Sequence, residues 1–184
     1  TKLPAVDAWQ HQATRDKKQI REWFKPNRNI GISTGKYGDG DQSLVVVDVD
    51  MKNGKDGEAS LELITMVDEL PATMESITPS ETPGRHIIFV SDKPYKNGVD
   101  VLGDGLDIRA SGGYIVAPGS TIEGKPYVAN RTRPAPLPKW LGEKISQAKP
   151  KAEIIELSIE KDQPHNIERA VQYLQDFAEP AIEG

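Results

Sequence analysis

The sequence contains no cysteine and no long hydrophobic run. Without cysteine, the 184-residue chain can form neither disulfides nor thiolate metal sites. Any metal ion must therefore be held by carboxylates, histidine or backbone oxygens, a ligand set that favours Mg²⁺ or Mn²⁺. No apolar segment approaches the roughly 20 residues that span a bilayer, and we find no signal peptide. These absences predict a soluble, cytoplasmic protein without membrane partners.

The chain also lacks the positive net charge that most nucleic-acid-binding proteins carry. Its formal net charge is −5 and its pI is about 5.3. Net charge does not decide this question, because local basic patches bind phosphates. A site built from several aspartates would itself lower the total. The acidic balance counts against a nucleic-acid partner without excluding one.

The length suits one large domain or two small ones, with a sizeable core. The chain starts with Thr1 rather than methionine, and we expect it to be part of a longer protein. Residues 147–162 are charged and poor in aromatics, which predicts a linker. We therefore expect a main domain over residues 1–146 and the helical start of a following module over residues 163–184.

Apolar patterning predicts an α+β fold. The strongest strand is Ser43–Val49, whose unbroken apolar run is typical of a central strand buried on both faces. Period-two and period-3.6 patterns predict the other elements. These are strands at residues 29–33, 74–78, 86–90, 106–109, 114–117 and 127–128, helices at 14–24, 57–70, 138–146 and 166–177, and a loop at 98–105.

Two aspartates mark the end of the central strand. Asp48 and Asp50 stand two positions apart, so they face the same side of the strand. Together they can hold a divalent cation, which would relieve their mutual repulsion. A pair of solvated turn aspartates is an equally weighted alternative, because so short a motif often occurs by chance.

Asp107 is a third acidic candidate. It lies between Leu106 and Ile108 in a short apolar strand, where a carboxylate is costly unless it faces a metal or a partner. Its alternative partner is Arg109, on the same strand face. With Asp48 and Asp50, it would complete a three-carboxylate, two-metal site.

Two polar turns offer groups for a triphosphate. One is rich in hydroxyls and precedes Arg85 and His86, and the other runs from Arg109 to Gly113 with glycines that let backbone N–H groups approach phosphate oxygens. For a lone histidine, a structural role is the commoner alternative. The residues expected to bind a nucleotide are Ser80, Arg85, His86, Arg109, Ser111 and Gly112.

Basic residues gather on the first predicted helix, at Lys17, Lys18 and Arg21. A solvated helix face is the commoner reading of such a run. Contact with the phosphates of a DNA template or primer is the alternative that we carry forward.

Taken in order, the segments VVVDVDMKNG, TPSETPGRHIIF and GLDIRASGGYIVAPGS resemble the bifunctional primase-polymerase domain of phage, plasmid and mobile-element replication proteins, in the archaeo-eukaryotic primase superfamily. The resemblance covers about residues 2–127. Asp48 and Asp50 match the family's DxD pair, Ser80 with His86 its Ser-x-His motif, and Asp107 its later aspartate. The turn before His86 is longer here than in the family and carries Pro83 in place of a glycine.

The resemblance implies an RNA-recognition-like sheet beside a smaller α/β unit, with a cleft between them. It implies a template-dependent DNA primase and polymerase in replication of a phage or mobile element, located in the host cytoplasm if phage-encoded. Two Mg²⁺ or Mn²⁺ ions would lie on the three aspartates, with NTP or dNTP, a single-stranded DNA template and a primer as partners. A family strand and helix would precede Lys2, and a helicase domain would follow in the full-length chain.

Two other functions remain open from the residues alone. A buried strand ending in DxD also suits haloacid-dehalogenase-like phosphohydrolases, although that class leaves the histidine and arginine turns unexplained. A non-catalytic nucleic-acid-binding module is the second alternative, and the presence of all three acids argues against it. The sequence does not distinguish ribonucleotide from deoxyribonucleotide substrates.

Overall fold

A computed structural model of the chain describes residues 4–25, 28–148, 168 and 172. The chain divides into two compact units, Thr1–Lys151 and Ala152–Gly184. The elements described below all belong to the first unit. Most of the expected linker and most of the expected last helix lie outside the described residues, although Glu168 and Gln172 are helical. No helix within the described residues is long and apolar enough to cross a membrane.

The largest sheet among the described residues has eight strands and is almost wholly antiparallel. Its main path runs β11-β4-β5-β3-β7-β6, with β2 paired to β3 and β12 paired in parallel to β5. The strands are β2 (Gly35–Lys36), β3 (Ser43–Val49), β4 (Met74–Ile77), β5 (Arg85–Ser91), β6 (Gly98–Gly103), β7 (Leu106–Arg109), β11 (Val128–Ala129) and β12 (Ala135–Pro136).

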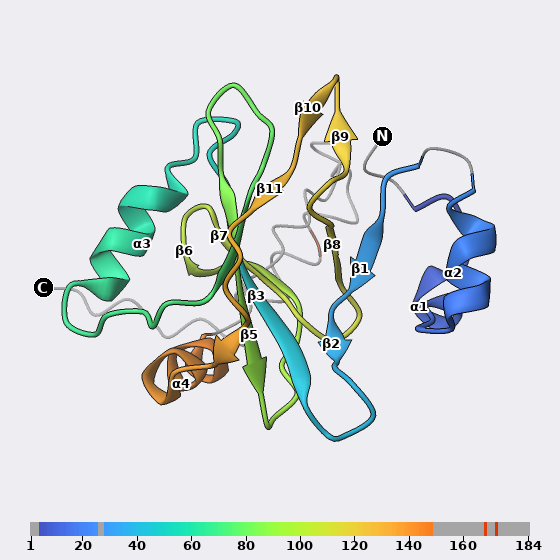
Figure 1. Cartoon of the computed structure of the whole chain (residues 1–184). Coiled ribbons are helices and arrows are strands. Elements are labelled where there is room, and N and C mark those ends of the chain that lie inside the picture. Colours follow the sequence, from blue (N-terminus) through green and yellow to red (C-terminus); the bar gives the residue numbers. More distant parts are fainter. Residues whose placement is uncertain (1–3, 26–27, 149–167, 169–171, 173–184) are drawn as a thin grey trace, which may run out of the picture. The chain divides into compact units, whose positions relative to one another are not determined.

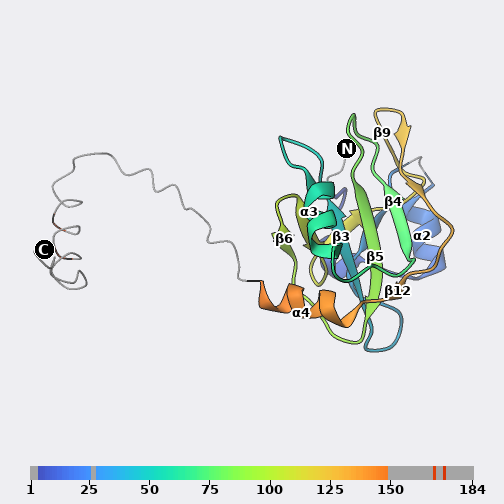
Figure 2. The same ribbon diagram turned by 90° about the vertical axis from the view of Figure 1, so that its left-hand side faces the viewer.

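Strand β3 lies at the centre of this sheet and is buried on both faces, as predicted. Val45, Val47 and Val49 point to one face, where they form the larger core with α3 (Gly57–Thr65) and α4 (Lys139–Gln147). Figure 1 and Figure 2 show both helices on this side of the sheet. The other face of β3 is therefore covered by a different layer of structure.

That other face carries a smaller core and a two-stranded sheet. Strands β1 (Gly31–Ser33) and β8 (Tyr114–Val116) pair antiparallel, and Ile115 packs with Leu44, Val46 and Ile88. The short hairpin of β9 (Thr121–Ile122) and β10 (Lys125–Pro126) follows β8. Helices α1 (Trp9–Gln12) and α2 (Lys17–Trp23) lie beyond β1 and bury no residue (Figure 1).

The mixed α+β class is confirmed, and the strands at Ser43–Val49 and Leu106–Arg109 have their predicted bounds. The predicted helix over residues 57–70 is too long, because α3 ends at Thr65 and leaves Val67 90% exposed. The predicted loop over residues 98–105 is wrong. Residues 98–103 of this segment form β6, which pairs with β7 across an irregular register and packs Val101 and Leu102 against the core.

Candidate active site

A row of polar side chains crosses the sheet on the face away from α3 and α4. Asp48 on β3 is the register partner of His86 on β5 and of Asp107 on β7. Register partners on neighbouring strands project to the same side, so the three side chains stand next to one another. His86 Nε2 lies 3.5 Å from Asp48 Oδ1. The strand registers therefore bring these three residues together although they lie far apart in the sequence.

The row continues to Ser76, which is the register partner of His86 on β4. Ser76 is fully buried, and its hydroxyl has no hydrogen-bond partner among the described residues. The sequence-based prediction named Ser80, which lies in the turn between β4 and β5, whereas the register of the two strands places Ser76 beside the histidine. Ser76 does not line the candidate pocket.

Arg109 joins two of the aspartates. Its Nε donates to Asp48 Oδ2 at 3.1 Å, and its Nη2 donates to Asp107 Oδ2 at 2.7 Å. The second oxygen of Asp107 accepts from the backbone N–H of Asp100 at 2.9 Å. Asp100 in turn is paired with Lys55, at 2.6 Å between Nζ and Oδ1. Asp107 is buried, so these donors offset the cost of removing its charge from water.

Asp50 follows the last residue of β3 and is held through its backbone. Its N–H donates to Gly105 O at 2.8 Å, and its carbonyl oxygen accepts from Gly57 N at 3.1 Å. A Cβ on Gly105, whose φ is +74°, would lie 2.7 Å from that carbonyl oxygen. This close packing of three backbone segments fixes the position of the Asp50 backbone, and with it the point from which the side chain projects. The carboxylate accepts a hydrogen bond from Lys52 N.

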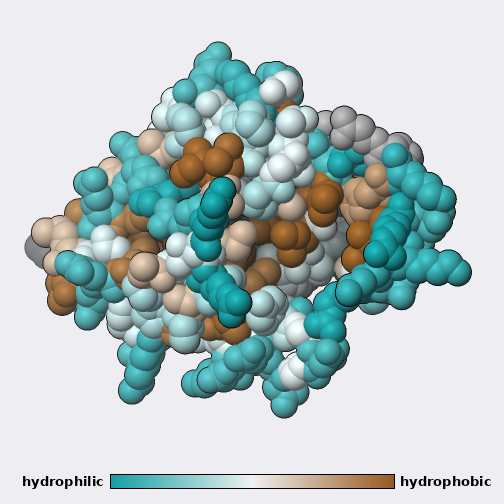
Figure 3. All heavy atoms as spheres, viewed as in Figure 1, coloured by the Kyte–Doolittle hydropathy of each residue, from teal (hydrophilic) through white to brown (hydrophobic). Residues whose placement is uncertain are grey.

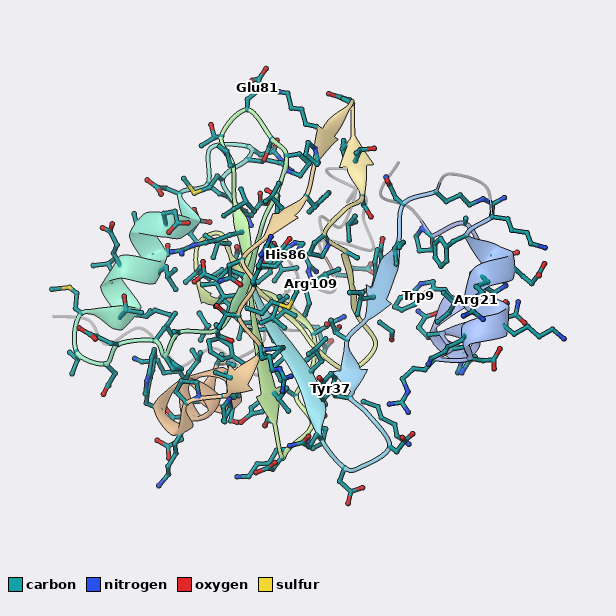
Figure 4. All side chains as sticks on the ribbon, in the orientation of Figure 1. Trp9, Arg21, Tyr37, Glu81, His86 and Arg109 are labelled. Atoms are coloured by element: carbon teal, nitrogen blue, oxygen red, sulfur yellow. The ribbon has the colours of Figure 1, made fainter. Side chains whose placement is uncertain are left out.

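Asp48, Asp50, His86, Arg109 and Gly112 line one pocket of about 360 Å³. Figure 4 shows His86 and Arg109 together near the centre of the sheet. The pocket also contains polar and aromatic residues that sequence reasoning did not assign to the site. These are Trp9, Lys52, Thr78, Asn97, Tyr114 and Tyr127.

Tyr127 packs against His86 in this pocket. It is almost fully buried, and its ring stacks on the imidazole of His86 with the centroids 6.0 Å apart. Burial raises the pKa of its hydroxyl, Lys52 opposes this rise, and the charge of Asp48 adds to it. Tyr127 therefore packs as a neutral phenol against the histidine.

The glycine turn after β7 is also positioned by the fold. Asn97 Oδ1 accepts from Ala110 N at 2.6 Å, and Gly113 N donates back to Ala110 O at 2.9 Å. Gly112 has a φ of +83° and lines the pocket. Ser111 is exposed, and it is absent from the pocket lining. The turn therefore presents the backbone of Gly112 to the pocket, and not the hydroxyl of Ser111.

Three groups of predicted residues lie elsewhere. Arg85 points to the α3 side of the sheet, where it pairs with Glu58 and Glu75 at 2.8 Å each. Neighbouring residues of a strand face opposite sides, so Arg85 and His86 cannot serve the same site. Ser80 donates to Thr82 O within its own turn. The basic residues Lys17, Lys18 and Arg21 are exposed on α2, outside the pocket lining.

The site carries oxygen ligands of the kind that Mg²⁺ and Mn²⁺ prefer. Asp48 and Asp50 both open onto the pocket. Among the described residues, however, no group of three or more histidine and acidic side chains is arranged to hold a metal ion. Arg109 lies where it neutralises Asp48 and Asp107. The donor chemistry of the two pocket aspartates fits a divalent ion, whereas Asp107 is engaged by other donors.

Comparison with known proteins identifies one family. The family described as bifunctional DNA primase/polymerase, N-terminal, matches residues 1–140. A search of the curated proteins found no match. The matched segment contains the whole polar row, both pocket aspartates and the glycine turn.

Proposed function

The chain belongs to the bifunctional DNA primase/polymerase family, and from this premise we propose that it transfers nucleotides from NTPs or dNTPs to a 3′-hydroxyl on a DNA template. The observation that carries the proposal is the row formed by His86, Asp48 and Asp107 on three neighbouring strands. Asp50, just after the central strand β3, lines the same pocket as Asp48 and His86. Family membership favours this activity over the phosphohydrolase and the non-catalytic binding module.

We propose that Asp48 and Asp50 hold the divalent ions, because both carboxylates open onto the pocket. Bound Mg²⁺ or Mn²⁺ would lower the pKa of the attacking hydroxyl and neutralise charge on the triphosphate. Asp107 would join them once Arg109 turns away from it. The protein itself contributes a fixed position for each carboxylate, since Asp48 belongs to a buried strand and the backbone of Asp50 is bonded on both sides.

The triphosphate would lie against His86, Arg109 and the backbone at Gly112. Arg109 is 31% exposed in its side chain and reaches the pocket, so it can donate to phosphate oxygens in a forked geometry. His86 lies on the same face of the sheet, on β5, with β3 between it and Arg109 on β7. Lys52 adds a second cation to the pocket lining. These donors would stabilise the charge that develops on the phosphates when pyrophosphate leaves.

Primer extension tests this proposal. Asp48→Asn and Asp50→Asn should each lower nucleotide incorporation on a primed single-stranded template at least about 100-fold in Mg²⁺ and in Mn²⁺. Asp92→Asn is the matched control, because Asp92 is exposed at the other end of β5 and the charge change is identical. Near-normal extension by either site variant would refute the metal assignment.

The same assay, run with ribonucleotides and with deoxyribonucleotides and with or without a primer, separates priming from extension. We also propose that residues 163–184 begin a further module, linked through residues 147–162 to the catalytic domain over residues 1–146. In a full-length protein this module would precede a helicase domain in replication of a phage or mobile element.

A further inference from the structure

A second cavity, of about 550 Å³, lies between the helices α1 and α2 and the strands β1 and β8. Aromatic rings are concentrated in its lining, at Trp9, Trp23, Phe24 and Tyr114, so two of the chain's three tryptophans face it. Figure 3 shows hydrophobic atoms gathered in this region between the sheet and α2. Among the described residues, the cavity is lined by Arg28 and by no aspartate or glutamate. The cavity therefore suits a flat apolar group attached to negative charge.

This aromatic cavity, lined by Trp9, Trp23, Phe24 and Tyr114, adjoins the candidate active site. Trp9, Tyr114 and Val116 line both hollows. The rings of Trp9 and Tyr114 meet edge to face, with centroids 4.9 Å apart and an interplanar angle of 71°. Both side chains are only half-buried. A strand whose last bases reached the catalytic aspartates would therefore pass this pair of rings.

Positive charge accompanies the aromatic rings. Lys17, Lys18 and Arg21 on α2 are exposed and form no ion pair within the part of the chain that the structure describes. Arg15 and Lys25, by contrast, are neutralised by Asp39 and Glu22. Figure 4 shows Trp9 between β1 and α2, with Arg21 on α2. The available cations are thus on the helix whose last residue, Trp23, lines the aromatic cavity.

We propose that the aromatic cavity receives an unpaired base of the single-stranded DNA template, while the template phosphates run along Lys17, Lys18, Arg21 and Arg28. The inference rests on the proposed polymerase function and adds the position at which the template enters. Stacking on aromatic rings tolerates any base, because every base presents a π-face, and a cationic track neutralises the backbone. A template must be held without regard to sequence, and this combination achieves that.

The test measures binding of fluorescently labelled oligodeoxythymidine and of an abasic oligomer of equal length, both in EDTA. The wild-type chain should bind the oligomer with bases more tightly. Trp9→Leu and Tyr114→Leu should each weaken that binding about tenfold and leave the abasic oligomer unaffected. Tyr37→Leu is the matched control, because Tyr37 is an exposed tyrosine beside the β2–β3 turn and outside both hollows. Trp9→Phe keeps an aromatic ring and should retain most of the affinity.

A triple variant, Lys17→Ser with Lys18→Ser and Arg21→Ser, should weaken binding of both oligomers. Its slope of log affinity against log salt should fall by about two units, since each phosphate contact on a single strand contributes about 0.7. An unaltered slope in the folded triple variant would overturn the phosphate track.

Three results would overturn the base site. They are equal wild-type affinity for the two oligomers, unchanged binding by folded Trp9→Leu and Tyr114→Leu, and displacement of the oligomer by free dTTP in EDTA. The last result would assign the cavity to an incoming nucleotide. The binding assay in EDTA does not depend on catalysis, so it tests the base site separately from the proposed function. If the wild-type chain bound the oligomer through its bases but extended no primer, that result would contradict the proposed function alone.

Discussion

Asp48 and Asp107 stand directly opposite each other on the antiparallel strands β3 and β7, and the guanidinium of Arg109 hydrogen-bonds to both carboxylates. Two like charges in register partners repel each other, and Arg109 offsets this repulsion. A divalent cation bound between the same carboxylates would offset it as well. On the proposed function, Arg109 and a metal ion would therefore compete for this pair of acids, and a bound triphosphate would offer Arg109 another partner.

This competition predicts the effect of Arg109→Gln. Without metal, the variant should lose about 2 kcal/mol in free energy of unfolding, because two facing carboxylates lose their cation. Mg²⁺ or Mn²⁺ should restore more stability to the variant than it adds to the wild-type chain. Urea unfolding in EDTA and in each metal measures both effects. The control is Arg15→Gln, at an exposed ion pair with Asp39. Equal stabilisation of Arg109→Gln and wild type by metal would contradict the competition.

The orientation of strand β5 predicts different outcomes for two adjacent residues. His86→Ala should weaken nucleotide binding about tenfold in the presence of metal, because it removes the imidazole that we propose to donate to the phosphates. Arg85→Gln should leave nucleotide affinity unchanged, since Arg85 faces α3, and should lower stability by about 1 kcal/mol by leaving Glu58 and Glu75 without their cation. Calorimetric titration with nucleotide compares the two. If His86→Ala bound nucleotide normally, His86 would have only a structural role.

Gly84 supports the turn that precedes His86. Its N–H donates to Thr78 Oγ1 at 3.1 Å, and a Cβ at this position would collide with the carbonyl oxygen of Val49, next to Asp50. Gly84→Ala should therefore destabilise the chain by about 2 kcal/mol or more. Gly40→Ala is the control, because nothing lies within 4 Å of the added methyl and the residue has no positive φ. Thermal unfolding of the two variants checks this, and similar melting temperatures would show that the hairpin can shift.

The ion pair of Lys55 with Asp100 predicts a pH dependence of stability. The hydrogen bond to Asp100 raises the pKa of Lys55 in the folded state. A raised pKa stabilises the fold fully below the unfolded pKa of about 10.4, and this contribution is lost as pH rises through the folded pKa. Lys55→Met should therefore cost about 1 kcal/mol in free energy of unfolding near pH 8, and this cost should shrink progressively as the pH rises above the unfolded pKa of about 10.4. Urea unfolding across this range tests the trend, and a constant difference would place the stabilisation in packing instead.

The sequence by itself determined the central strand and the side on which its acids lie. Ser43–Val49 contains the unbroken apolar run Leu44–Val47, and such a run is stable where both faces of the strand are covered. The period of two then places Asp48 and Asp50 on one face without any knowledge of the fold. The same period also separates Arg85 from His86, although the motif had suggested that they act together.

Only the tertiary structure decided which residues face those acids. The register of β3 with β5 and β7 places His86 and Asp107 on either side of Asp48, and no local pattern encodes a register between strands so far apart. The segment predicted as a loop is the strand β6 because it pairs with β7. The same pairing brings the Asp100 N–H to the carboxylate of Asp107. Trp9, Tyr114 and Tyr127 reach the pocket from separate elements. Their positions follow from long-range packing, because strand pairing and core contacts outweigh the local preferences that a sequence displays.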